Sequence, residues 1–134
     1  MKKILIIHSQ EKGVKNVALG IKKEAERQGH RVDIEEASVT GQEISFHQYD
    51  LVIVGSEKTG FIKGKPASDI APTLNRCKRT VGQDCYAYIT PSLLGATRAL
   101  KKLMEEMEKH GCVVKDFATL KKEKDGEEFA RERI

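Results

Sequence analysis

The first 21 residues restrict the fold more than any other part of the chain. Residues 4–7 form an apolar run, and a polar turn at 9–12 leads through Gly13 into apolar residues at the 3.6-residue period of a helix. A buried strand that enters a tight turn and then a helix leaves free backbone N–H groups at the positive end of that helix. Such an arrangement binds anions, phosphates above all. A second strand that ends in a similar turn, 51–56, suggests the other half of a ligand crevice.

Apolar runs and helical periods alternate along the whole chain, and this alternation predicts an α/β fold. The run at 50–55 has four successive apolar residues, as in a central parallel strand that is covered on both faces. We expect a single domain, residues 1–134, with a doubly wound five-stranded parallel sheet in the order 2-1-3-4-5. The predicted strands are 3–8, 31–36, 50–55, 84–90 and 112–120, and the predicted helices are 13–28, 94–110 and 127–133.

The middle of the chain has a less regular pattern. Residues 56–66, rich in lysine and glycine, predict a long loop. A helix is expected to follow, and two prolines leave two alternatives for it. Either the helix begins at Pro66 and kinks, or only residues 72–79 are regular because of Pro72. Two further polar connections are expected at 37–48 and 121–126.

Length and composition restrict the class of protein. No apolar run in the 134 residues approaches the ~20 residues of a membrane span, so no membrane association is expected. The apolar stretch near the N-terminus has only four residues and no cleavage site, which predicts a cytoplasmic protein without a signal peptide. The three cysteines are expected to be packing residues, since none has CxxC spacing. The four histidines are scattered, so no metal site is predicted.

Positive charge is concentrated in one segment. The net charge is +4, and residues 57–82 account for all of it, with six cationic residues against two carboxylates. One interpretation is a solvated loop and helix face. The other is a patch that attracts an anionic ligand or an acidic protein partner. Nucleic acid is not expected as a partner, because aromatic residues are not interleaved with the cations.

A ligand crevice is expected where the strand order reverses, between the first and third strands. Three turns meet at that edge of the predicted sheet, 9–15, 56–61 and 91–95. Competing motifs fail. A GxGxxG motif is absent, a Walker-like segment has Pro66 where Ser or Thr should bind magnesium, and the strand ends lack the acids of a phospho-receiver domain. No nucleophile set is indicated, so no catalytic residue is predicted.

The chain resembles the flavodoxin family, in its short-chain form, over nearly its full length. The resemblance is carried by residues 3–9 with Gly13, by residues 49–56, and by residues 86–90 ahead of a long helix. It implies a flavodoxin-like fold and an FMN cofactor, with the phosphate in the first turn and the isoalloxazine ring between the next two loops. The implied FMN-binding residues are Ser9, Gln10, Glu11, Lys12, Gly13, Val14, Lys15, Ser56, Glu57, Lys58, Thr59, Gly60, Phe61, Thr90, Pro91, Ser92, Leu93 and Gly95.

The first turn departs from the family's pattern. Only Ser9 keeps a hydroxyl side chain, and Glu11 places a negative charge where the phosphate should lie. Val14 and Lys15 stand in place of an Asn-Thr pair. Phe61 is the aromatic candidate for stacking on the ring, and ordinary packing remains an equal alternative for it.

Two functions remain open at this point. The first is an FMN-binding electron-transfer protein, an electron carrier rather than an enzyme with its own catalytic side chains, because the flavin supplies the chemistry. Its redox partner is expected to be acidic, since the surroundings of the crevice are basic. The second is a flavodoxin-like domain that has lost FMN and acts as a protein-binding or regulatory module.

Overall fold

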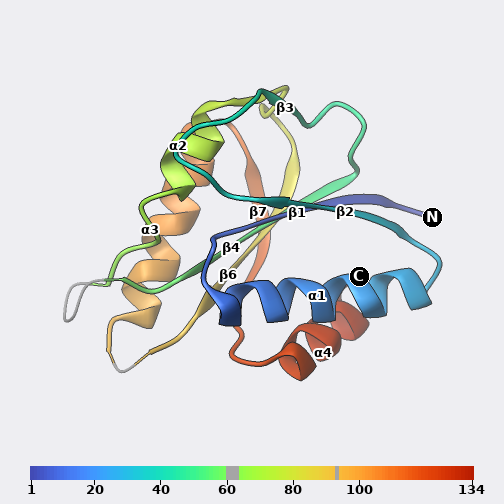
Figure 1. Cartoon of the computed structure of the whole chain (residues 1–134). Helices are drawn as coiled ribbons and strands as arrows, with labels where there is room; N and C mark the ends of the chain where they lie inside the picture. The colour runs from blue at the N-terminus through green and yellow to red at the C-terminus, as the bar shows by residue number, and fades with distance from the viewer. Residues whose placement is uncertain (60–63, 93) are drawn as a thin grey trace.

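The computed structural model describes residues 1–59, 64–92 and 94–134. Its strands are β1 Lys3–His8, β2 Arg31–Glu36, β3 Ile44–Ser45, β4 Leu51–Glu57, β5 Cys77–Lys78, β6 Asp84–Thr90 and β7 Val113–Thr119. Its helices are α1 Lys12–Arg27, α2 Ile70–Asn75, α3 Ala96–Lys109 and α4 Glu123–Arg133. The main sheet is parallel, with the order β2-β1-β4-β6-β7 (Figure 1). This arrangement confirms the predicted fold class and strand order.

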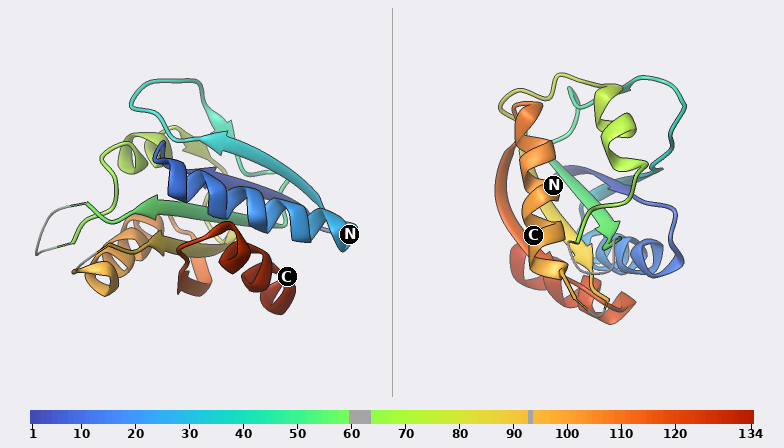
Figure 2. Two further views of the ribbon diagram at one scale, coloured as in Figure 1. Left: turned by 60° about the horizontal axis from the view of Figure 1, so that its bottom comes forward. Right: turned by 90° about the vertical axis from the view of Figure 1, so that its left-hand side faces the viewer.

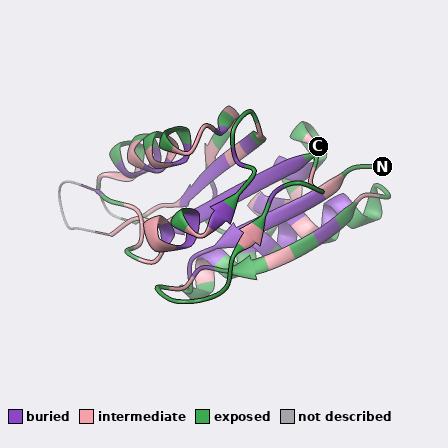
Figure 3. Cartoon of the chain, turned by 90° about the horizontal axis from the view of Figure 1, so that it is seen from above, coloured by how far each residue is buried: buried purple, intermediate pink, exposed green. Residues whose placement is uncertain are grey.

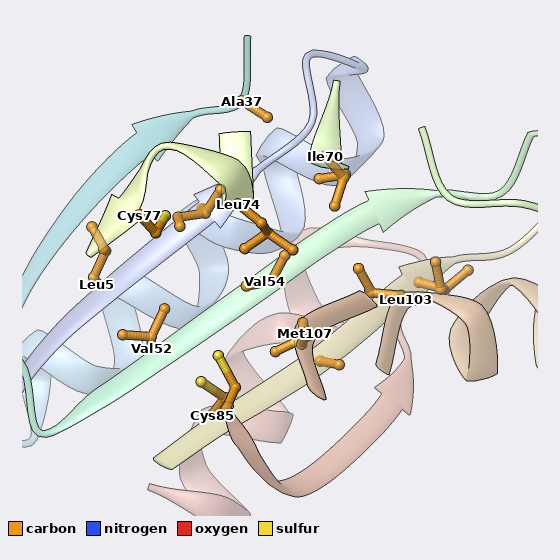
Figure 4. Packing of buried hydrophobic residues seen from close by; sticks show 14 of the residues in the cluster. Leu5, Ala37, Val52, Val54, Ile70, Leu74, Cys77, Cys85, Leu103 and Met107 are labelled. Atoms are coloured by element: carbon orange, nitrogen blue, oxygen red, sulfur yellow. The ribbon is translucent and has the colours of Figure 1, made fainter. Parts of the chain in front are cut away.

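Helices cover both faces of the sheet. Figure 2 shows α1 and α4 side by side on one face, with α2 and α3 on the other. Both faces of the central strands are therefore buried (Figure 3), as their continuous apolar runs predict. On the α2–α3 face, Leu5, Val52 and Leu103 point into one cluster (Figure 4), and Ile4 belongs to the cluster on the other face.

The region between β4 and β6 differs from both predicted alternatives. The helix α2 spans only Ile70–Asn75, so it neither begins at Pro66 nor covers residues 72–79. Pro72 lies in its first turn, where a missing N–H removes no helical hydrogen bond. The helix ends early because Cys77 and Lys78 pair with Ile44 and Ser45 in a small second sheet. That pairing also corrects the prediction of an irregular connector at 37–48.

The last helix begins at Glu123, four residues before the predicted start. The Asp125 carboxylate accepts hydrogen bonds from the backbone of Lys121 at 3.0 Å and of Lys122 at 2.9 Å, which stabilises the helix start. Gly126, expected to end a loop, lies inside the helix. A glycine is needed there because α1 passes close to it. A Cβ atom at Gly126 would lie 2.4 Å from the carbonyl oxygen of Val17.

Other expectations concern burial. The three cysteines are buried and unpaired, as expected of packing residues, and all belong to the cluster on the α2–α3 face. In the described ranges, no helix combines the length and the apolar character that crossing a bilayer requires.

Candidate functional site

The three predicted turns meet at the carboxyl ends of the central strands (Figure 1). The Ser9 N–H donates to the Gly55 carbonyl at 3.0 Å, which joins the first turn to the end of β4. The Lys58 N–H donates to the Thr90 carbonyl at 3.2 Å, which joins the second turn to the third. Gly64 also lies against the residues before α3. The structure therefore brings the predicted loops together in the described part of the chain.

Tyr88 positions the start of α1 from beneath. Its side chain is fully buried, and its hydroxyl donates to the carbonyl of Val14 at 2.9 Å. The ring occupies the space left by Gly55, where a Cβ atom would lie 2.0 Å from the ring carbon Cζ. Burial raises the pKa of Tyr88, so the hydroxyl remains a donor. This role of Tyr88 was not predicted from the sequence, although a glycine next to a run of buried strand residues is a usable signal.

The Ser9 hydroxyl is engaged inside the protein. Ser9 is fully buried, and its Oγ donates to the Glu57 carboxylate at 2.5 Å. The Glu57 N–H donates back to the same oxygen at 3.3 Å. Ser9 and Glu57 were predicted to contact the phosphate and the ring of FMN, respectively, whereas here they contact each other.

Glu11 caps the first turn of α1. It is the N-cap residue, and its Oε2 accepts the N–H of Val14 at 3.0 Å. The side chain of Gln10 turns away, because its Nε2 donates to the carbonyl of Ala37 at 3.0 Å. Lys12 is exposed to solvent. The outermost predicted residue of this turn, Lys15, is also exposed.

Asp69, which the sequence analysis did not single out, adds a further carboxylate. It immediately precedes α2, and the backbone of Gln10 forms a hydrogen bond that lowers its pKa. Desolvation outweighs that effect and raises the pKa of Asp69 overall, and the charges of Glu57 and Glu36 add to the rise. Its Oδ1 is buried without a hydrogen-bond partner among the described residues. An acidic group therefore lies beside the first turn, on the side of α2.

The second and third loops are only partly described. Ser56 is buried, and its Oγ accepts the N–H of Ala67 at 2.7 Å. Thr59 pairs with Lys65 in an antiparallel bridge. The Thr90 Oγ1 is buried and has no partner in the described ranges. Pro91 is half-buried, Ser92 is exposed and Gly95 is the N-cap residue of α3, whereas three predicted residues lie outside the described residues, namely Gly60, Phe61 and Leu93.

Comparison with known structures shows what the fold is similar to. Flavodoxin 1 from Bacillus cereus superposes with a TM-score of 0.72 at 15% identity, over 97% of this chain and 93% of the other. The chain has a flavodoxin-like fold. The flavodoxin of Megasphaera elsdenii superposes with a TM-score of 0.67 at 14% identity, over 96% and 98% of the two chains. A Lactobacillus acidophilus flavoprotein, solved in complex with FMN, gives 0.66 at 18%, over 89% and 93%. No protein-family model and no curated protein matches the sequence.

The first turn of this flavodoxin-like domain does not fit an FMN phosphate as it stands. A phosphate that accepts the Val14 N–H would have to displace the Glu11 carboxylate. The Ser9 hydroxyl already donates to Glu57, and Asp69 adds a further acidic group. A carboxylate within about 4 Å of a phosphate costs on the order of 1 to 4 kcal/mol, depending on screening. The carboxylates at this turn therefore oppose a dianion, whereas the exposed cations of Lys12 and Lys15 partly offset them.

The predicted basic segment is divided in the structure. The guanidinium of Arg76 is used internally, donating to the carbonyl of Ser38 at 2.8 Å and to that of Gln42 at 3.1 Å. Lys65 lines a groove between α2 and α3, whereas Lys78 lines a different hollow with residues near β3. In the described ranges, no cluster of three or more His, Cys, Asp or Glu residues is arranged to hold a metal ion.

Proposed function

We propose that this chain is a flavodoxin-like protein-binding module that works without FMN. The observation that carries the proposal is the engagement of the first turn by the chain's own carboxylates. Glu57 accepts the Ser9 hydroxyl, and Glu11 accepts the Val14 N–H. Two of the donors that could hold a phosphate are thus already satisfied, and the negative charges of Glu11 and Glu57 oppose a further anion. A shared fold does not itself carry a shared function.

The proposed partner is an acidic protein that contacts the groove between α2 and α3. This groove has a volume of about 420 Å³. Its lining includes Lys65, Lys102 and Lys109, together with Glu105 and Glu106. Glu106 forms a salt bridge with Lys109 at 3.3 Å. Within the described ranges, no carboxylate lies within salt-bridge distance of Lys65 or Lys102, so their charges are available to an acidic surface.

Charge reversal tests this interface. The double variant Lys65→Glu and Lys102→Glu should lose a partner that wild-type protein retains in affinity capture, because rim charges govern encounter. The matched control is Lys78→Glu with Arg79→Glu, which changes the net charge equally at exposed positions away from the groove. A partner that both double variants retain would show that the groove charges are not used.

An FMN-binding electron carrier is the second candidate function. It is supported by the flavodoxins of similar fold, one of them a flavoprotein in complex with FMN. The Thr90 Oγ1 is buried and has no hydrogen-bond partner among the described residues, and it lies at a strand end where a ligand hydroxyl could pair with it. In this alternative, residues 9–15 would hold the phosphate, residues 56–61 and 90–95 would flank the ring, and the flavin would supply the electron chemistry.

Flavin binding distinguishes the two candidates directly. If the chain is the proposed module, we expect the purified protein to be colourless and not to quench the fluorescence of FMN at concentrations up to about 1 mM. A dissociation constant of about 1 mM corresponds to only about 4 kcal/mol of binding. A yellow protein, or saturable quenching well below that concentration, would instead establish the electron carrier.

A further inference from the structure

We infer that the Glu11 carboxylate takes the place of an external anion at the N-terminus of α1, and that Glu11, Glu57 and Asp69 together exclude phosphate from this turn. This inference deepens the proposed function. It rests on that proposal only in taking the module to work without FMN. It assigns a discriminating role to three acidic residues that come from three different segments of the chain.

Glu11 occupies the position that an anion takes at a helix N-terminus. Its backbone is extended, with φ −64° and ψ 139°, and its carboxylate folds back over the first turn to accept the Val14 N–H at 3.0 Å. A Cβ atom built at Gly13 would lie 3.0 and 3.2 Å from the two carboxylate oxygens. The negative charge therefore lies against the positive end of a 16-residue helix. An external anion would compete with an anion that is covalently attached.

Glu57 removes the hydroxyl donor of the turn. Ser9 has one O–H, and that O–H donates to Glu57 Oε1 at 2.5 Å. The Glu57 N–H in turn donates to the Ser9 oxygen. The two contacts direct the hydroxyl proton toward Glu57. Ser9 therefore has no O–H left to donate to an incoming oxyanion.

Asp69 places a third acidic group beside the turn. Its segment is joined to the end of β4, because the Ala67 N–H donates to the Ser56 Oγ at 2.7 Å, and the Asp69 Oδ1 is buried without a hydrogen-bond partner among the described residues. Glu57 and Asp69 therefore lie near each other and near the turn that Glu11 caps. A dianion that enters here meets acidic groups on the sides of β4 and α2 as well as on α1.

Charge removal at constant shape tests the inference. The triple variant Glu11→Gln, Glu57→Gln and Asp69→Asn keeps oxygen acceptors at all three positions but removes the carboxylate charges. We expect it to bind inorganic phosphate and FMN at least tenfold more tightly than wild type, measured by calorimetry and by FMN fluorescence. Riboflavin, which lacks the phosphate, should show no such gain.

A matched triple variant controls for net charge. Glu26→Gln, Glu108→Gln and Glu132→Gln change the net charge equally at exposed positions of α1, α3 and α4, and no gain in affinity is expected. If the triple site variant fails to fold, the single variant Glu11→Gln is used as the test. Its affinity for phosphate should rise by about threefold, because removal of one carboxylate charge has a smaller electrostatic effect than removal of three. Folding of each variant is checked by circular dichroism.

The outcomes separate the inference from the proposed function. If wild type binds FMN tightly and the site variant binds tenfold more tightly still, the proposed function fails and the inference holds. If wild type does not bind FMN and a folded site variant gains nothing over the control, the inference is overturned and the proposed function stands.

Discussion

At the scale of single residues, Tyr88 shows how a buried hydroxyl positions the turn before α1. It extends from β6 across Gly55 and reaches the carbonyl of Val14. The turn therefore depends on a contact 74 residues away in the sequence. Such a contact cannot be predicted from local patterns, which identified Tyr88 only as a strand residue.

The Tyr88 contact predicts an asymmetry between two tyrosines. Tyr88→Phe should lower the free energy of unfolding by about 1 kcal/mol, because a buried hydrogen bond is lost. Tyr86→Phe is the matched control, since its hydroxyl also donates to a carbonyl, that of Arg133 at 2.9 Å, but at an exposed position. Its effect should stay within about 0.5 kcal/mol in urea titrations. Equal losses in the two variants would contradict the role assigned to Tyr88.

At the scale of elements, α1 and α4 form a closely packed pair on one face of the sheet (Figure 2). Two glycines allow the close approach, since a Cβ atom at Gly20 would lie 2.1 Å from the carbonyl oxygen of Glu123, and Gly126 faces Val17. Glu24 adds an electrostatic link, with Arg27 at 2.6 Å and Arg131 of α4 at 3.3 Å. Gly126 was predicted to lie in a loop, because the sequence alone does not show that α1 packs against this glycine.

Glu24 predicts a specific loss of stability in acid. Its hydrogen bond with Arg27 is the main cause that lowers the pKa of Glu24 from 4.5 to about 2 in the folded protein. A carboxylate with a lowered pKa stabilises the folded state above its unfolded pKa, and this contribution disappears as pH falls from about 4.5 toward 2. In Glu24→Gln, the free energy of unfolding should therefore decline less steeply over that pH range.

The control for this pH dependence is Glu26→Gln, on the exposed side of the same helix. Its acid decline should match that of wild type, measured by urea unfolding at a series of pH values. A Glu24→Gln profile that is parallel to wild type between pH 4.5 and 2 would show that Arg27 and its other partners do not stabilise the ionised form of Glu24 in the folded protein.

At the scale of the whole molecule, two apolar clusters share one sheet. Cys77, Cys85 and Cys112 lie in the cluster under α2 and α3, and Tyr88 lies in the cluster under α1 and α4. Because the central strands contribute side chains to both clusters, neither face can open widely without disturbing the other. This arrangement favours cooperative unfolding of the two faces.

Thiol reactivity tests that cooperativity. Burial raises the pKa of Cys77 to about 12, and reaction requires the thiolate, so labelling of Cys77 in the native state should be slow. The unfolding free energy derived from thiol labelling should equal the value from near-UV circular dichroism of the tyrosines. Labelling at markedly lower denaturant would mean that the α2–α3 face opens by itself.

The fold was predictable because its determinants are local and repeated. Apolar runs and helical periods marked each strand of the main sheet and three of the four helices in the described part of the chain. A helix was expected near α2, but its bounds were wrong because two prolines obscure a six-residue element. The strands β3 and β5 were missed because two-residue strands leave no pattern.

The candidate site was predictable only in its location. The order of the strands placed the three turns together, and contacts such as that between Lys58 and Thr90 agree. The partners of each side chain were not predictable, because the bond between Ser9 and Glu57 joins residues 48 positions apart. Asp69 carried no motif at all, although the negative charge of Glu11 was visible in the sequence.

The capped first turn has a consequence for how the protein matures in a cell. Since Glu11 satisfies the Val14 N–H from within the chain, the start of α1 has its own cap and does not need an external anion for it. If the chain works without FMN, as proposed above, its steady-state abundance should be the same in riboflavin-starved and riboflavin-replete cultures, measured by quantitative immunoblotting.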